Sequence, residues 1–302
     1  MSGTIAWVTI KTAARNFGRD NVMILSAALA FFSMLSLAPL LVLLLTVTGW
    51  LGPDTQQRVV ERAESLVGPQ ASEMIGTVMQ KVQGQQNLAS TAAIIGLIGT
   101  LIAATGAFTH LQYSLNRIFK VRLKKEKGFI FTWLWTRLLS LLMILAIAAV
   151  LIASVVVASA ISMVFAQGGV VWKVVNLVVS AAVFSLAFML MFKVMPDVRL
   201  SWGSALMGGI ITGLLFLAGQ YGISEYLARA GAGSAFGAAG SLAVLLVWMF
   251  YSAVVIFVGA ELTHAYVSCC GKQVTPDRHA EPTEEAAQVA REQQEMVHAH
   301  SD

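Results

Sequence analysis

Six long stretches without a charged residue dominate the chain. A helix needs about 20 apolar residues to cross the hydrocarbon core of a bilayer, and each stretch is long enough. They are too continuously apolar for the alternating strands of an outer-membrane barrel, whereas a helix satisfies its own backbone hydrogen bonds in lipid. The pattern predicts an all-α polytopic membrane protein with six transmembrane helices, over about 22–50, 88–113, 138–166, 170–192, 200–224 and 235–260.

The composition agrees with this class, because 57% of the 302 residues are hydrophobic and only 12% are charged. An average soluble domain carries about 25% charged residues. The first apolar stretch has no small-residue cleavage site and is longer than the core of a signal peptide, so we expect it to remain as an anchor. Within it, Pro39 removes one backbone donor, which predicts a kink or hinge that Ser36 offsets with a local hydrogen bond.

The Lys and Arg residues indicate how the helices are oriented. Of the 20 residues, 15 lie in the N-terminal segment, the 117–137 loop, the 193–199 loop and the C-terminal tail, which six spans place on one side. Loops rich in Lys and Arg face the cytoplasm. We therefore predict that both termini are cytoplasmic.

Three segments are predicted to lie outside the bilayer. Residues 1–20 have a weakly amphipathic, basic pattern that favours a helix on the inner leaflet. The external 51–87 loop shows helical periodicity and predicts two short amphipathic helices, which either lie in the interface or cap an opening. Residues 269–302 are polar and predict a flexible cytoplasmic tail. Residues 21–268 remain as the transmembrane domain.

The sequence predicts no catalytic or metal centre. The adjacent Cys269 and Cys270 form no disulfide framework, and the His residues of the tail are too few and too loosely spaced for a metal site. A hydrolase needs clustered carboxylates, a metal or a nucleophile beside its base. The ionisable residues are instead divided between the two membrane sides and the tail. We therefore expect neither enzyme activity nor a cofactor.

A glycine-rich segment, ARAGAGSAFGAAGSL (228–242), joins the last two predicted spans on the outer side. Its GxGxxxG lacks the spacing and the preceding strand of a dinucleotide loop, and the chain has no P-loop. Two interpretations stay open. The small residues either pack closely, like Gly209 and Gly213 in the fifth span, or form a hinge or a helix N-terminus that faces anionic headgroups. The candidates are Gly231, Gly233, Gly237 and Gly240.

Ionisable side chains are costly in hydrocarbon, so those near the spans are candidate functional residues. Glu261 lies at the inner end of the last span and Arg137 at the inner start of the third, so we predict that they pair as an inner gate or contact a headgroup. Asn116 and Arg117 are candidate headgroup donors. His110 lies deep in the second span, where a hydrogen bond inside the bundle is the alternative to a functional role.

The basic run NRIFKVRLKKEKGF (116–129) resembles a surface for nucleic acid or for anionic lipid. Each Lys or Arg near the inner leaflet contributes about 1 kcal/mol to lipid binding. Topology alone would also produce this run, and no aromatic stacking platform accompanies it. We expect anionic headgroups to bind at the 117–137 loop, and we expect no nucleic acid.

Several segments resemble the YihY/BrkB family of bacterial inner-membrane proteins, over most of residues 20–268. The resemblance rests on ALAFFSMLSLAPLL (28–41), LNRIFKVRLKKEKGFIFTWLWTRLLSLLMILA (115–146), VMPDVRLSWGSALMGG (194–209) and, most specifically, FGAAGSLAVLLVWMFYSAVVIFVGAELTHAY (236–266). It implies six helices in a bacterial cytoplasmic membrane. Some members have carried a ribonuclease BN label, and others are named after a serum-resistance factor.

The resemblance also extends to single positions. Residues that recur in the family match here at Asn116, Arg117, Arg137, Pro196, Gly237, Gly240, Trp248, Tyr251, Gly259 and Glu261. The family often has Asn after the Pro, where this chain has Asp197.

We therefore predict a transporter or lipid-handling protein of the cell envelope, flippase- or exporter-like, that acts on an amphipathic or anionic substrate. Two other classes stay open: a membrane-anchored ribonuclease, and a non-catalytic scaffold that recruits partners through its basic loop and tail. Membrane lipids are the expected partners. A homo-oligomer, the substrate and the energy coupling are left open by the sequence.

Overall fold

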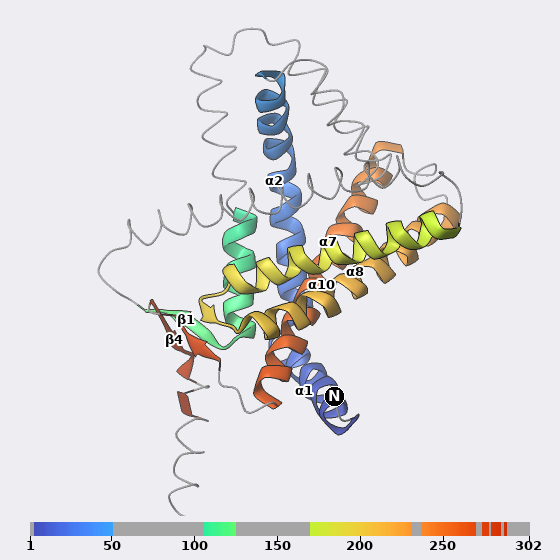
Figure 1. The fold of residues 1–302 in the computed structure, drawn as a ribbon. Coiled ribbons are helices and arrows are strands. Elements are labelled where there is room, and N and C mark those ends of the chain that lie inside the picture. The colour runs from blue at the N-terminus through green and yellow to red at the C-terminus, as the bar shows by residue number, and fades with distance from the viewer. Residues whose placement is uncertain are drawn as a thin grey trace, which may run out of the picture. The chain divides into compact units, whose positions relative to one another are not determined.

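The computed structural model describes residues 3–50, 106–124, 170–230, 237–269, 274–277, 279–284 and 287–288. Five helices in these ranges are α1 (Gly3–Arg19), α2 (Val22–Trp50), α7 (Val170–Val194), α8 (Trp202–Ala230) and α10 (Gly237–Cys269). A further helix covers residues 106–118 and is green in Figure 1. The strands are β1 (Val121–Leu123), β2 (Val198–Arg199), β3 (Thr275–Pro276) and β4 (Ala280–Pro282).

The chain divides into two compact units. One comprises residues 1–23, 111–219 and 254–302, and the other comprises residues 24–110 and 220–253. The first unit contains all four strands of the described residues and the polar clusters discussed below.

Three of the described helices contain stretches that are long and apolar enough to cross a membrane: Leu177–Val194, Trp202–Ile223 and Leu245–Cys269. They lie in α7, α8 and α10, so the predicted spans at 170–192, 200–224 and 235–260 are helical over residues 170–192, 202–224 and 237–260. α10 continues nine residues further, to Cys269. The third span and the 51–87 loop lie outside the described residues, as does most of the second span. Six spans and their orientation stay predictions.

Two helices form the N-terminal region. α1 buries Thr9 and Ala13 and exposes Trp7 and Ile10, and its place at the inner leaflet stays a prediction. Asn21 has a left-handed backbone (φ 56°), which separates α1 from α2. Such a backbone is uncommon for residues other than glycine, and Asn is among those that tolerate it best.

α2 continues through Pro39 to Trp50. Ser36 Oγ donates a hydrogen bond to Ser33 O (2.9 Å), so the predicted local bond of this hydroxyl is present. The carbonyl that Pro39 leaves without its helical partner belongs to Leu35, four residues earlier. Ser36 therefore bonds a different carbonyl, and the kink at Pro39 stays a prediction.

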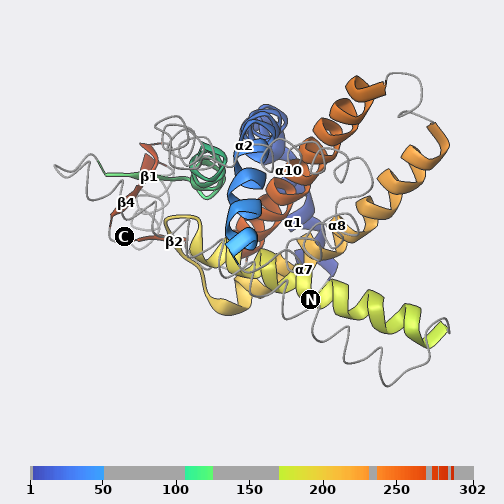
Figure 2. The same cartoon turned by 90° about the horizontal axis from the view of Figure 1, so that it is seen from above.

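α8 packs closely on α7 through the GxxxG glycines (Figures 1 and 2). A Cβ atom on Gly209 would lie 2.7 Å from the backbone N of Met189, and one on Gly213 would lie 2.8 Å from Ser185 Oγ. Real Cβ atoms essentially never approach this closely. Small residues at these positions allow the two backbones to meet, as is usual between membrane helices.

α8 and α10 meet through a reciprocal Gly and Thr arrangement. The Thr263 side chain fills the space beside Gly208, and the Thr212 side chain fills the space beside Gly259. Each Thr hydroxyl donates to a carbonyl of its own helix, Thr212 to Gly208 O and Thr263 to Gly259 O, both at 2.7 Å. Both hydroxyls are therefore satisfied inside a tight helix contact.

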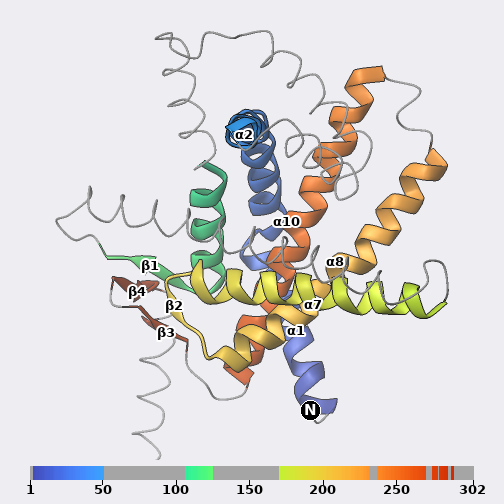
Figure 3. The same ribbon diagram turned by 45° about the horizontal axis from the view of Figure 1, so that its top comes forward.

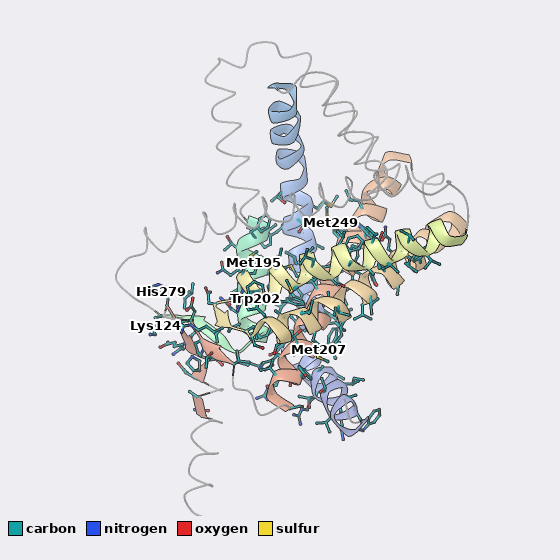
Figure 4. The ribbon with its side chains drawn as sticks, in the orientation of Figure 1. Lys124, Met195, Trp202, Met207, Met249 and His279 are labelled. Carbon is teal, nitrogen blue, oxygen red and sulfur yellow. The ribbon has the colours of Figure 1, made fainter. Side chains whose placement is uncertain are left out.

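Two short antiparallel ribbons join the C-terminal segment to earlier loops (Figure 3). β4 pairs with β1, and β3 pairs with β2. Figure 4 places Lys124 and His279 next to each other beyond β1, where the Lys124 backbone N donates to His279 O at 3.0 Å. A flexible tail is predicted here from its polar composition. Strands of two or three residues carry no readable periodicity, so the sequence gives no sign of these ribbons.

Exposed ion pairs accompany these ribbons. Arg122 contacts Glu281 (2.9 Å) and Glu284 (2.8 Å), and Arg199 contacts Asp277 (3.1 Å). Exposed pairs of this kind contribute little to stability. They do mean that two arginines of the predicted cytoplasmic loops face acidic side chains of the tail.

Candidate functional site

Two acidic residues are buried among the described residues, Asp20 and Glu261. Glu261 lies on α10 and is 1% exposed, while Asp20 follows the last residue of α1 and is 4% exposed. The Asp20 carboxyl lies close enough to that of Glu261 to interact with it electrostatically. Burying two carboxyl groups near each other is costly, so this pair, with Glu261 on the apolar helix α10, marks a candidate functional site.

Lys120 supplies the positive charge of this site. It follows the 106–118 helix, and its left-handed backbone (φ 58°) ends that helix. Its Nζ donates to Asp20 Oδ1 in an ion pair. The side chain of Lys120 is 18% exposed and that of Asp20 is 5% exposed, so only the lysine reaches the surface to any extent.

Glu261 has no comparable partner. Neither of its carboxyl oxygens has a hydrogen-bond partner among the described residues, and the same is true of Asp20 Oδ2. Asp20, Lys120 and Asn16 lie close enough to act on Glu261 electrostatically, yet none meets hydrogen-bond geometry with it. The site therefore contains acceptors that lack a donor.

His264 lies almost one turn beyond Glu261 on α10 and faces the same two charged residues, Lys120 and Asp20. Its ring packs edge-on against Phe119, with centroids 5.9 Å apart. Its buried Nδ1 has no hydrogen-bond partner among the described residues. We call Asp20, Lys120, Glu261 and His264 the ionisable cluster.

A second polar group surrounds Asp197 in the turn between α7 and α8. Asn116 Nδ2 donates to Asp197 Oδ2 (2.6 Å), and the Asp197 backbone N donates to Asn116 Oδ1 (2.8 Å). Gln112 Nε2 donates to the same carboxyl at 3.2 Å. Burial raises the pKa of Asp197, and the bonds from Asn116 and Gln112 oppose that rise only in part. The carboxylate is thus held in place at an electrostatic cost.

The same turn is closed by Lys193, near the end of α7. Its Nζ donates to Leu200 O and lies 5.2 Å from the centroid of the Trp202 ring, which Figure 4 labels. A cation above an aromatic face is attracted by the ring. Lys193 therefore stabilises the turn that positions Asp197.

The predicted site residues have different surroundings in the structure. Glu261 joins the ionisable cluster, whereas Arg137 lies outside the described residues, so their pairing stays a prediction. Asn116 uses its amide on Asp197, and Arg117 is exposed. His110 Nε2 donates to Leu25 O (3.3 Å), a hydrogen bond of the kind that the sequence analysis gives as the alternative to a functional role.

The hinge candidates are described only in part. Gly237 begins α10 and Gly240 lies in its first turn, while Gly231 and Gly233 lie outside the described residues. Asp20, Lys120 and His264 were not predicted from the sequence as parts of one site. A usable signal exists for Asp20, which is the acidic residue directly before the first apolar stretch in an otherwise basic segment.

Comparisons with known proteins give a consistent result. Residues 13–284 match a family model described as virulence factor BrkB. A UPF0761 membrane protein of Pseudoalteromonas atlantica is 26% identical over 260 residues, which cover 82% of this chain and 81% of the relative. Another, from Alkalilimnicola ehrlichii, is 27% identical over 262 residues, which cover 84% of this chain and 57% of the relative.

One relative has a name of a different kind. The Bacillus subtilis protein YfkH, named only as ribonuclease-like, is 25% identical over 247 residues, which cover 78% of this chain and 87% of the relative. No solved structure matches the chain.

Proposed function

Because the chain belongs to the virulence factor BrkB family and is an integral membrane protein, we propose that it is a transporter or lipid-handling protein. On this proposal it is flippase- or exporter-like, lies in the bacterial inner membrane with both termini in the cytoplasm, and acts on an amphipathic or anionic substrate. The ionisable cluster is the observation that carries the proposal. Ionisable side chains within membrane helices typically line ion or substrate pathways.

The cluster differs from a simple structural ion pair. A structural pair needs one carboxylate for one ammonium, yet two buried carboxyl groups face Lys120 here. Replacing a buried pair by apolar residues is often neutral or stabilising, so burial of an additional carboxyl group brings no evident gain in stability. A role in function accounts for retaining it.

The substrate class follows from charge and exposure. Arg117 is exposed at the end of the 106–118 helix, close in sequence to Lys120. A basic side chain at the membrane surface attracts phosphate-bearing headgroups. An anionic amphipath could therefore place its headgroup near Arg117 while its apolar tail stays in lipid.

Reconstituted vesicles test this function. We expect purified full-length protein in proteoliposomes to move fluorescent anionic phospholipids between leaflets, or to take up an amphipathic anion. E261A removes a carboxyl group of the cluster and should reduce the rate of flux by at least about tenfold. A tenfold change corresponds to about 1.4 kcal/mol of lost interaction. R137A tests the predicted inner gate in the same assay, and E281Q, an exposed carboxyl in β4, is the matched control.

Other outcomes would support the two alternatives. RNA cleavage by the purified protein that a single carboxylate substitution abolishes would favour the ribonuclease and contradict transport. Absence of flux, together with protein complexes that require residues 114–137, would favour the scaffold.

A further inference from the structure

Three buried carboxyl oxygens of the ionisable cluster lack a hydrogen-bond donor among the described residues. They are Glu261 Oε1, Glu261 Oε2 and Asp20 Oδ2. Two ionised carboxylates can only accept hydrogen bonds, so neither can satisfy the other. A single proton on either carboxyl group changes this, because the resulting O–H can donate to the facing carboxylate.

The charges of the cluster also favour one bound proton. Lys120 forms its ion pair with Asp20 and also acts electrostatically on Glu261, so one ammonium group faces two carboxyl groups. The other groups that face the pair are Asn16 from α1, which is uncharged, and His264 from α10. Two carboxylates that share one site do not both remain ionised. One bound proton cancels the unpaired negative charge.

We propose that Asp20 and Glu261 together hold one exchangeable proton and that, given the transport function proposed above, this proton is the coupling ion. Protonation forms an O–H bond on one carboxyl group, which then donates to the other carboxylate, and release returns the proton to water. Lys120 contacts Asp20, and its side chain is more exposed than that of Asp20. The proton would therefore enter or leave the cluster beside Lys120.

A proton fits this site better than a metal ion. Calcium and magnesium take about six or more oxygen ligands, and among the described residues no group of three His, Cys, Asp or Glu side chains is arranged to hold a metal. One oxygen of Asp20 is already used by Lys120. A proton needs only one donor position and one acceptor position, which the two carboxyl groups supply.

Substitutions distinguish a shared proton from two independent carboxyl groups. E261Q and D20N each replace one carboxyl by an amide of the same shape and leave nothing to share. Among the carboxylic acid C=O bands in infrared difference spectra of the full-length protein, we expect one that titrates with pH and disappears in both variants. E281Q should leave that band unchanged. Should each variant remove a different band, or neither remove one, the shared proton would be contradicted.

A flux measurement tests the coupling. Wild-type proteoliposomes should accumulate substrate when a proton gradient is imposed, and a protonophore should abolish the accumulation. E261Q, which cannot release the shared proton, should lose the gradient-driven accumulation, whereas the exposed control E281Q should keep it. D20N serves as the second variant if E261Q does not fold. Transport that ignores the gradient would overturn the coupling and leave transport itself intact. Complete absence of transport would instead contradict the proposed function, while the infrared bands still decide the proton site.

Discussion

Residue 197 is an aspartate in this chain, at a position where the family that it resembles often has asparagine. Its carboxyl accepts bonds from Asn116 and Gln112, and burial raises its pKa. A raised pKa in the folded state means that folding favours the protonated acid. The contribution of this group to stability is thus fully present below the unfolded pKa and is lost as the pH rises through the folded pKa.

The substitution D197N should therefore stabilise the protein at neutral pH. An amide has no charge to bury, and its oxygen can still accept the bond from Asn116. We expect the melting temperature in detergent at neutral pH to rise by about 2–4 °C, the effect of roughly 1 kcal/mol in a chain of this size class. The gain should vanish at acidic pH, where Asp197 is protonated. A lower melting temperature at neutral pH would show that the charge is required.

Lys120 offers a second test at the level of single residues. K120M removes the ammonium partner of the buried Asp20 and leaves its carboxylate without an ion-pair partner. Breaking a buried pair in this way costs about 3–5 kcal/mol. Chemical or thermal unfolding in detergent should show a loss of this order.

The matched control is R122M, two residues away, whose ion pairs are exposed. It should change stability far less than K120M. The double variant K120M/D20N should recover part of the loss, because it removes the uncompensated charge. Equal effects of K120M and R122M would mean that Lys120 is no more important than a surface charge.

At the level of helices, the contact between α8 and α10 depends on glycine at two positions. A Cβ atom at Gly208 would lie 3.2 Å from Phe192 Cδ2 and closer still to the Thr263 side chain. We expect G208A to destabilise the protein by about 1–3 kcal/mol, the usual cost of overpacking. T263A added to G208A should restore part of the lost stability, because it removes the Thr263 atoms that clash with the new methyl group.

Gly222, also on α8, has no atom within 4 Å of the position that a Cβ would occupy. G222A should therefore be neutral or slightly stabilising, since alanine favours a helix by about 1 kcal/mol over glycine. Unfolding of both variants in the same detergent compares them directly. If G222A were as harmful as G208A, helix packing would not explain the effect.

At the level of the whole molecule, the sequence predicts the membrane class and, among the described residues, the approximate extents of the long helices, because long uncharged runs have one physical solution in lipid. It also selects Glu261, since an ionisable residue in an apolar run is conspicuous. The partners of Glu261 could not be predicted in the same way. Lys120 and Asp20 are 100 residues apart, and helical periodicity carries no information about contacts at that separation.

The same reasoning applies to the turn that carries Asp197 and to the C-terminal strands. Asn116 and Asp197 are 81 residues apart. β3 and β4 have two and three residues, too few for an alternating pattern to be recognised. Both features depend on tertiary pairing, so only the folded chain reveals them.

The central claim is that the buried cluster of Asp20, Lys120 and Glu261 serves transport. The most direct measurement is substrate or lipid flux in proteoliposomes that contain equal amounts of folded wild-type, E261A or E281Q protein. We predict flux for the wild type and for E281Q, and a loss of at least about tenfold for E261A. Equal flux in all three would contradict it.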